Sequence, residues 1–184
     1  MILTVSRLYP AKRVDVLIEA TRRLIDQGFS VKLLVIGEGP EKAGLHSLVH
    51  RLGLAQKVVF EGAVPEIEIQ KYFTAADVFA FAAPDEPWGL VVLEAMTYGL
   101  PVVVPDKGGL AEMIQDGVTG LQVSGGRPES YAERLKMILE NPRLARRIKY
   151  AAQSLVRERF TIERMVDSLE AFYLRTHESC PRRV

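Results

Sequence analysis

The fold is decided by residues 1–36, which read MILTVSRLYPAKRVDVLIEATRRLIDQGFSVKLLVI. This stretch opens and closes with short apolar runs, Ile2 to Val5 and Val31 to Ile36, which are typical of buried strands. Between them, apolar residues recur at spacings of three and four over residues 13 to 27. That spacing predicts a helix with one buried stripe, closed by Gly28. A strand, a helix and a second strand predict one β-α-β unit of a parallel sheet.

The same alternation continues along the chain. Further strands are expected at Val58 to Phe60, Val78 to Phe81, Val102 to Val104 and Leu121 to Val123. Further helices are expected from Pro40, placed in a first turn, to about Leu52, over residues 66 to 75, and from Leu90 to Tyr98. After residues 125–128 the strand signals end, and residues 129 to 177 predict two or three helices broken near 141–142 and 160–161. The predicted fold class is therefore α/β: a doubly wound, Rossmann-like parallel sheet of about six strands with a helical C-terminal appendage, as one domain over residues 1–184.

Composition limits the classes of function. The 184 residues are 48% hydrophobic and 26% charged, as in one ordinary globular domain. Twenty-four Lys and Arg against 23 Asp and Glu give a net charge of +1, so no global field favours nucleic acid or membrane as the main partner. Cys180 is the single cysteine, so an internal disulfide is ruled out and a reducing cytoplasm is the expected compartment. No apolar run reaches about 18 residues, so neither a transmembrane span nor a cleavable signal is expected.

Residues 85–96, which read DEPWGLVVLEAM, carry the strongest chemical signal. Six of the seven residues from 90 to 96 are apolar, which predicts a helix buried nearly all round except at Glu94. A buried carboxylate needs hydrogen-bond donors from the protein or from a hydroxyl-bearing ligand; the alternative is that Glu94 lies on the one edge that reaches water. Gly89 lets a ligand approach the free amides of Leu90 and Val91, where an anion can bind, unless it is only a turn residue.

The loop after the first strand supplies charges of the matching sign. Arg7 and Lys12 stand five residues apart, and Pro10 between them stiffens the turn. In a parallel sheet this loop and the helix that follows Gly89 share one rim, so the two cations and the free amides can enclose one diphosphate. Each cation taken alone fits a solvated loop equally well.

Together these segments resemble the C-terminal, donor-binding domain of the family 4 glycosyltransferases, the retaining GT-B enzymes also called glycosyl transferases group 1. The resemblance covers most of the chain and lies in residues 6–8 with Lys12, 35–40, 59–64, 76–78, Glu86 and Glu94 as a Glu-x7-Glu pair, 94–96, 99–103, 108–112 and 116–121. Each segment alone is weakly diagnostic, but their order and spacing together are specific. The sequence departs from the family pattern at Ala82-Ala83, where Pro-Ser is common, at Arg13, where Gly is usual, and at Ala111, where Pro is usual.

The resemblance implies a role for each matching residue. Arg7 and Lys12 would hold the donor diphosphate with help from the Leu90 amide, and Glu94 would accept hydrogen bonds from the ribose. Glu86 would face hydroxyls of the transferred sugar. The donor-binding residues implied are Arg7, Lys12, Gly37, Val64, Glu86, Gly89, Leu90, Val91 and Glu94, of which Gly37 and the loop around Val64 would border the base. Glu86, Arg7 and Lys12 would be the catalytic residues.

The resemblance also implies the reaction and its requirements. The donor would be a nucleoside-diphosphate sugar of UDP, GDP or ADP type, and transfer would retain the anomeric configuration. Two cations and a helix N-terminus stabilise a departing diphosphate electrostatically, so neither a metal nor another cofactor is expected. His46 and His50 are four residues apart but lack the Glu of a zinc-protease motif, and a polar helix face is the expected role for them.

Partners follow from what the family adds to this domain. Its members carry an N-terminal Rossmann-like domain that binds a saccharide or lipid acceptor, whereas this sequence begins at the first strand of the second domain. We therefore expect this chain to bind donor but to transfer sugar weakly or not at all. An apolar stripe from Ile162 to Tyr173, which crosses onto the missing domain in the family, is either uncovered and a candidate dimer contact or packed on the domain's own sheet.

A basic stretch raises the question of an anionic partner. Its cations are Arg143, Arg146, Arg147, Lys149, Arg157 and Arg159. A solvated helix surface is the ordinary explanation; the alternative is anionic lipid at the inner face of the membrane, and nucleic acid is not expected.

Other classes of protein remain as alternatives. A dinucleotide oxidoreductase would need Gly-x-Gly-x-x-Gly after the first strand, whereas Gly37 and Gly39 follow the second and lack the third glycine. GT-B epimerases and phosphorylases share the architecture, but the Glu-x7-Glu pair with Arg7 and Lys12 favours a transferase. A non-catalytic module that binds a nucleotide sugar or a protein partner is the third alternative.

Overall fold

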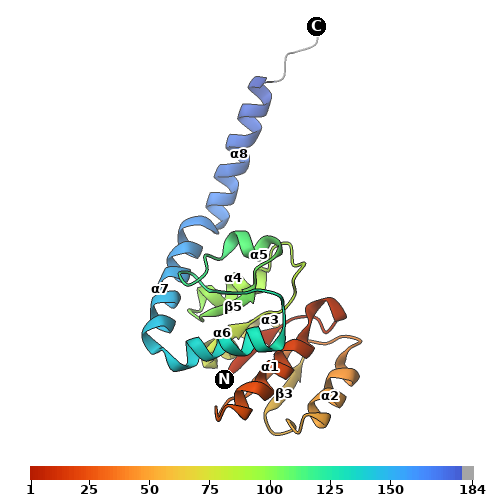
Figure 1. The fold of residues 1–184 in the computed structure, drawn as a ribbon. Helices are drawn as coiled ribbons and strands as arrows, with labels where there is room; N and C mark the ends of the chain where they lie inside the picture. The colour runs from red at the N-terminus through yellow and green to blue at the C-terminus, as the bar shows by residue number, and fades with distance from the viewer. Residues whose placement is uncertain (180–184) are drawn as a thin grey trace.

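A parallel sheet of six strands forms the centre of the protein, whose computed structural model describes residues 1–179 (Figure 1). The strands are β1 Ile2–Val5, β2 Leu33–Ile36, β3 Val58–Gly62, β4 Val78–Ala80, β5 Val102–Pro105 and β6 Leu121–Val123. Their order across the sheet is β3-β2-β1-β4-β5-β6, and each pairs in parallel with its neighbours. The predicted Rossmann-like fold class is confirmed. Cys180 lies outside the described residues.

Helices cover both faces of this sheet. They are the 3-10 helix η1 Pro10–Lys12 and the α-helices α1 Val14–Asp26, α2 Lys42–Arg51, α3 Glu66–Ala75, α4 Leu90–Thr97, α5 Gly108–Met113, α6 Pro128–Glu140, α7 Pro142–Arg159 and α8 Ile162–Ser179. Alternate strand residues point to opposite faces. Ile2 belongs to an apolar cluster that includes residues of α1, α2 and α6, and Leu3 belongs to one that includes residues of α3, α4, α5 and α7. The chain therefore has one apolar core on each side of the sheet.

Several element boundaries differ from the expected ones. The second strand begins at Leu33 because the preceding residues form a turn in which the Val31 amide bonds to the Phe29 carbonyl. Pro40 stands before α2 and not in its first turn, since the Glu41 amide bonds to the Leu8 carbonyl and ties this segment to the loop after β1. Residues 108–113, where the sequence pattern predicts no helix, form the short helix α5. The three C-terminal helices and their two breaks are as predicted.

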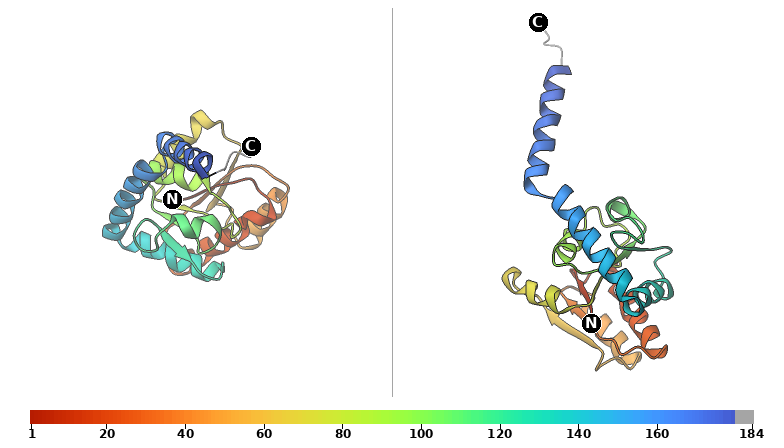
Figure 2. Two further views of the ribbon diagram at one scale, coloured as in Figure 1. Left: turned by 90° about the horizontal axis from the view of Figure 1, so that it is seen from above. Right: turned by 90° about the vertical axis from the view of Figure 1, so that its left-hand side faces the viewer.

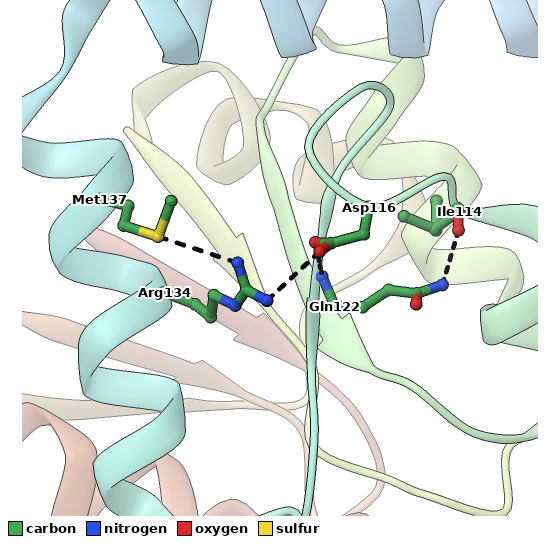
Figure 3. Close-up of polar contacts among 5 residues, drawn as sticks. All are labelled: Ile114, Asp116, Gln122, Arg134 and Met137. Carbon is green, nitrogen blue, oxygen red and sulfur yellow. Dashed lines mark hydrogen bonds and ion pairs between the residues drawn. The ribbon is translucent and has the colours of Figure 1, made fainter.

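A polar brace holds α5 against β6 and α6 (Figure 3). The Asp116 carboxylate accepts hydrogen bonds from the backbone N–H of Gln122 at 2.8 Å and from the Arg134 guanidinium at 3.2 Å. The Gln122 side chain in turn donates to the carbonyls of Ile114, at 2.6 Å, and Ala111, at 3.1 Å. Both carbonyls belong to the end of α5 or the residue after it, so the brace fixes the position of this short helix.

Helix α8 extends away from the sheet domain (Figures 1 and 2). All the members of its apolar stripe are exposed, and they are Ile162, Met165, Val166, Leu169, Phe172 and Tyr173. The alternative that this stripe packs on the domain's own sheet is therefore wrong, and the dimer contact stays a prediction. Within residues 1–179 no helix is long and apolar enough to cross a membrane.

Candidate functional site

A pocket of about 720 Å³ opens at the carboxyl ends of β1, β2, β3 and β4. Strand β1 pairs with β2 on one side and β4 on the other, so the strand order reverses there, which is where doubly wound sheets bind their ligands. The nine residues singled out from the sequence all line this pocket: Arg7, Lys12, Gly37, Val64, Glu86, Gly89, Leu90, Val91 and Glu94. The fold thus brings segments from four different loops to one cavity.

The loops after β1 and β2 meet closely at the pocket floor. Gly37 has φ +134°, and a Cβ placed there would lie 1.9 Å from the Ser6 carbonyl oxygen. A side chain at this position would therefore push the two loops apart.

The cations enter the pocket from the loop after β1. Lys12 ends η1, and its Nζ lies 5.6 Å from the centroid of the Phe81 ring. The Arg7 guanidinium lies 5.5 Å from the centroid of the Tyr9 ring and has no carboxylate partner among residues 1–179. Arg13, which follows Lys12, adopts φ +51°, a left-handed conformation that glycine adopts more readily. The departure from the family glycine at this position therefore places backbone strain next to the cationic loop.

The start of α4 presents free amides to the same cavity. Gly89 precedes the helix with φ +60°, and a Cβ there would lie 2.5 Å from Leu110 Cδ2. The left-handed backbone conformation favours glycine, and a larger residue would also have to displace the Leu110 side chain of α5. The amides of Leu90 and Val91 find no hydrogen-bond partner in the part of the chain that the structure describes. These two N–H groups form an unsatisfied, positive helix end.

The expected all-round burial of α4 is wrong. Val92, Ala95 and Met96 are buried, but Leu90 is 68% exposed and Glu94 is also exposed. The reason is that one face of α4 borders the pocket and has no protein against it. Of the two positions considered for Glu94, the structure shows the edge that reaches water, and that edge lines the pocket.

The Glu94 carboxyl is partly desolvated and finds no hydrogen-bond donor within residues 1–179. Partial desolvation, and secondarily the charge of Glu66, raise the pKa of the Glu94 carboxyl above its ordinary value. No described residue donates a hydrogen bond to its carboxylate. Glu94 is therefore an acceptor that a hydroxyl-bearing ligand can satisfy.

Glu86 has the opposite environment. One carboxylate oxygen accepts from Lys12 Nζ at 2.5 Å and the other from the Gly89 amide at 3.3 Å. Desolvation by itself raises the pKa of Glu86, but the Lys12 hydrogen bond and the Gly89 amide outweigh it, so the pKa lies below its ordinary value. Its backbone is fixed by α5, because the Gly109 amide donates to the Glu86 carbonyl at 3.2 Å.

Three aromatic residues of this region were not singled out from the sequence. Trp88 lines the pocket and is 68% exposed, although it falls within the stretch that drew attention to Gly89. Phe81 underlies Lys12 but was assigned only to a strand. Tyr131 of α6 is fully buried and donates from its hydroxyl to the Phe81 carbonyl at 3.1 Å. Only the tertiary fold brings Tyr131 near Phe81, so no sequence signal marks it.

The positions of the side chains are the only evidence that the structure gives about metal binding. No group of three or more His, Cys, Asp or Glu side chains among residues 1–179 is arranged to hold a metal ion. His46 lies on the exposed side of α2, with its ring stacked on Phe60 at a centroid distance of 4.2 Å. The prediction that no metal is needed therefore stays a prediction.

Known proteins give an independent comparison. The family model for glycosyl transferases group 1 matches residues 1–155. A D-inositol 3-phosphate glycosyltransferase of Streptomyces griseus is 36% identical over 156 residues, which are 80% of this chain and 33% of that protein. The matched part of the chain thus spans only 32–36% of the length of the first curated relatives.

Solved structures show the same fold. Anabaena HepE in complex with UDP and glucose superposes with a TM-score of 0.82 and 28% identity, over 92% of this chain and 48% of HepE. The C-terminal domain of a glycosyl transferase group 1 protein, LpcC from Francisella tularensis, superposes with a TM-score of 0.79 and 25% identity, over 88% of this chain and 86% of that domain.

Proposed function

Because the chain belongs to the glycosyl transferases group 1 family, we propose that its pocket binds a nucleoside-diphosphate sugar as the donor for retaining, metal-independent glycosyl transfer. The observation that carries this proposal is the convergence of two cations, a free helix start and two acidic side chains on one cavity at the strand-order reversal. The UDP and glucose named for HepE, which is 28% identical, support the same class of ligand.

Each side of the pocket matches one part of such a donor. Arg7, Lys12 and the Leu90 amide suit a diphosphate, because charged donors and a helix start both favour anions. Among residues 1–179 Glu94 has no hydrogen-bond donor, and it suits the ribose hydroxyls. Gly37 and Val64 line the cavity at the ends of β2 and β3 and suit a base there. UDP, GDP and ADP donors all fit this description.

The chemistry needs charge stabilisation above all. The bond between the anomeric carbon and the donor phosphate breaks, and its electron pair leaves with the diphosphate, which Arg7 and Lys12 stabilise. The acceptor oxygen attacks on the face that the leaving group vacates, so the configuration is retained. A phosphate oxygen of the donor takes the acceptor's proton. Glu86 orients the transferred sugar through its hydroxyls.

The alternatives fit the structure less well. In a dinucleotide oxidoreductase the glycine-rich turn follows β1, whereas Gly37 and Gly39 follow β2. A purely partner-binding module gives no reason for an acidic side chain without donors to face a cavity lined by two cations.

We expect this chain to bind donor without efficient turnover, because it matches only about a third of the length of relatives such as the Streptomyces griseus enzyme. The test is a thermal-shift panel of UDP, GDP and ADP with their sugars. At a ligand concentration of 100 times Kd the native state gains about 2.7 kcal/mol, which raises the Tm of a domain of this size by about 5–10 °C. Stabilisation by one nucleotide class, unchanged by a metal chelator, is the expected result.

Two variants assign that shift to the pocket. Arg7→Met and Lys12→Met should each reduce it, while Arg51→Met, which removes an exposed cation from the far end of α2, should leave it unchanged. A panel in which no nucleotide sugar stabilises the wild type would overturn the proposal. Rapid sugar transfer by this chain alone would contradict the expectation that it binds donor without efficient turnover.

A further inference from the structure

The carboxylate of Glu86 already occupies donors that the pocket offers to an anion. It accepts from Lys12 Nζ at 2.5 Å and from the Gly89 amide at 3.3 Å. The two paired side chains are largely shielded from water, with 22% of Lys12 and 17% of Glu86 exposed. A shielded, charge-assisted pair of this kind is stronger than a surface ion pair. The site therefore contains an anion of its own.

The Glu86 carboxylate uses only some of the anion-binding groups of the pocket. Arg7 has no carboxylate partner, and the amides of Leu90 and Val91 have no acceptor, within the described residues. A diphosphate that enters the pocket can therefore bind Arg7 and the start of α4, whereas Lys12 is already neutralised by Glu86. To use Lys12, it must replace the Glu86 carboxylate or lie beside it. Lying beside it sets like charges close together in a partly desolvated cavity, which is unfavourable.

The carboxylate can leave only by rotation of its own side chain. The Glu86 carbonyl accepts from the Gly109 amide at 3.2 Å, and a Cβ on Gly108 would lie 2.8 Å from that same carbonyl oxygen. The backbone of Glu86 is therefore held against the start of α5. Side-chain rotation is inexpensive, but it takes the carboxylate away from Lys12 and from the amide, so new donors must compensate. Hydroxyl groups of a bound sugar are such donors.

We propose that Glu86 acts as an internal competitor of the nucleoside diphosphate and thereby makes the site select the intact sugar donor over the diphosphate alone. This inference rests on the proposed function. With a sugar present, Glu86 exchanges Lys12 for sugar hydroxyls and the diphosphate takes Lys12. Once the sugar has been transferred, the carboxylate loses those hydroxyls, returns to Lys12 and weakens the hold on the remaining diphosphate. Glu86 is then a specificity-determining residue that also favours product release.

Isothermal titration calorimetry on the wild type and on Glu86→Gln tests this exchange. The ligands are UDP, GDP or ADP, whichever the thermal-shift panel selects, and the corresponding nucleotide sugar. Gln has nearly the same shape but no charge. Glu86→Gln should bind the nucleoside diphosphate about tenfold more tightly and the nucleotide sugar no more tightly than the wild type does. The preference for the intact donor should accordingly fall by about tenfold.

Asp85→Asn is the matched control. Asp85 is the adjacent exposed acid, has no ion-pair partner in the structure of residues 1–179 and does not line the pocket. Removing its charge should change either affinity by less than about twofold. A circular dichroism unfolding curve establishes that each variant is folded, and Glu86→Ala, which carries the same expectation, replaces Glu86→Gln if the latter is not.

The outcomes separate the two proposals. Suppose that the wild type binds the nucleotide sugar, but Glu86→Gln binds the diphosphate no more tightly than the wild type does. The carboxylate is then no competitor, and this inference is wrong while the proposed function stands. If Asp85→Asn gives the same gain as Glu86→Gln, the effect is general charge removal and the inference is again wrong. If the wild type binds neither ligand, the proposed function and this inference fail together.

Discussion

Replacing Tyr131 by Phe should destabilise the protein by removing one hydroxyl from the core. Tyr131 is fully buried on α6, and its hydroxyl donates to the Phe81 carbonyl at 3.1 Å, just beyond the end of β4. Burial raises the pKa of this hydroxyl, so it remains a neutral donor at every physiological pH. In Tyr131→Phe the ring still fills its space, but the buried carbonyl loses its donor. Leaving a buried polar group unsatisfied costs about 1–3 kcal/mol.

Chemical unfolding in urea, followed by circular dichroism, measures this loss. We expect the free energy of unfolding to fall by about 1.5 kcal/mol at an unchanged m-value, and Tm to fall by about 3–6 °C. Tyr150→Phe is the control, because Tyr150 on α7 is 63% exposed and its hydroxyl needs no protein partner; its effect should stay within about 0.5 kcal/mol. A loss below about 0.5 kcal/mol for Tyr131→Phe would refute the reasoning that this hydrogen bond joins α6 to the floor of the pocket.

Three further predictions concern the supports of the site. Gly109→Ala should destabilise by about 1–3 kcal/mol, because its Cβ would lie 1.8 Å from the Pro87 carbonyl oxygen, whereas Gly44→Ala, in open space on α2, should stabilise by about 0.5–1 kcal/mol; thermal unfolding compares them. Gln122→Ala should cost about 1–3 kcal/mol, since two carbonyls at the end of α5 lose their donor, and hydrogen exchange should show α5 opening more often. The pKa of Glu94 is raised in the folded state, so the group favours folding at pH values below its unfolded pKa, and this contribution disappears as pH rises through the folded pKa. Glu94→Gln should therefore be more stable than the wild type near neutral pH, and the difference should shrink in acid. A difference that stays constant across a pH series of unfolding curves would contradict this.

The sheet and the location of the site follow from local patterns in the sequence. Apolar runs separated by helical periodicity determine a parallel sheet, and in such a sheet loops after β1 and β4 must share a rim. That constraint is enough to bring Arg7 and Lys12 to Gly89, although Gly89 lies 77 positions after Lys12 in the sequence. Helix caps and strand ends are less predictable, as Pro40 shows, because hydrogen bonds between loops decide them.

Side-chain pairing inside the pocket does not follow from the sequence. The apolar residues of α4 indicated a helix buried on all sides, but periodicity does not distinguish a face that contacts protein from a face that borders a cavity, so Leu90 was misplaced. The contact of Glu86 with Lys12 depends on a backbone position set by α5, a helix too short and too rich in glycine to be expected. Tyr131 reaches the site from α6 only through the fold.

The two acidic residues of the pocket are held in opposite electrostatic states by the same short segment. The chain turns at Gly89 between them, so Glu86 lies within reach of Lys12 and the amides before α4, while Glu94 lies farther along the helix, beyond those donors. The pKa of Glu86 is lowered and the pKa of Glu94 is raised. Among residues 1–179 the first carboxylate has hydrogen-bond donors and the second has none. A ligand that only brings an anion improves neither. Under the proposed function, a ligand that carries hydroxyls on both sides of a diphosphate would satisfy Glu94 and release Glu86 at once. Under that proposal, the opposite states of the two carboxylates would make the pocket prefer a complete nucleotide sugar to the diphosphate alone.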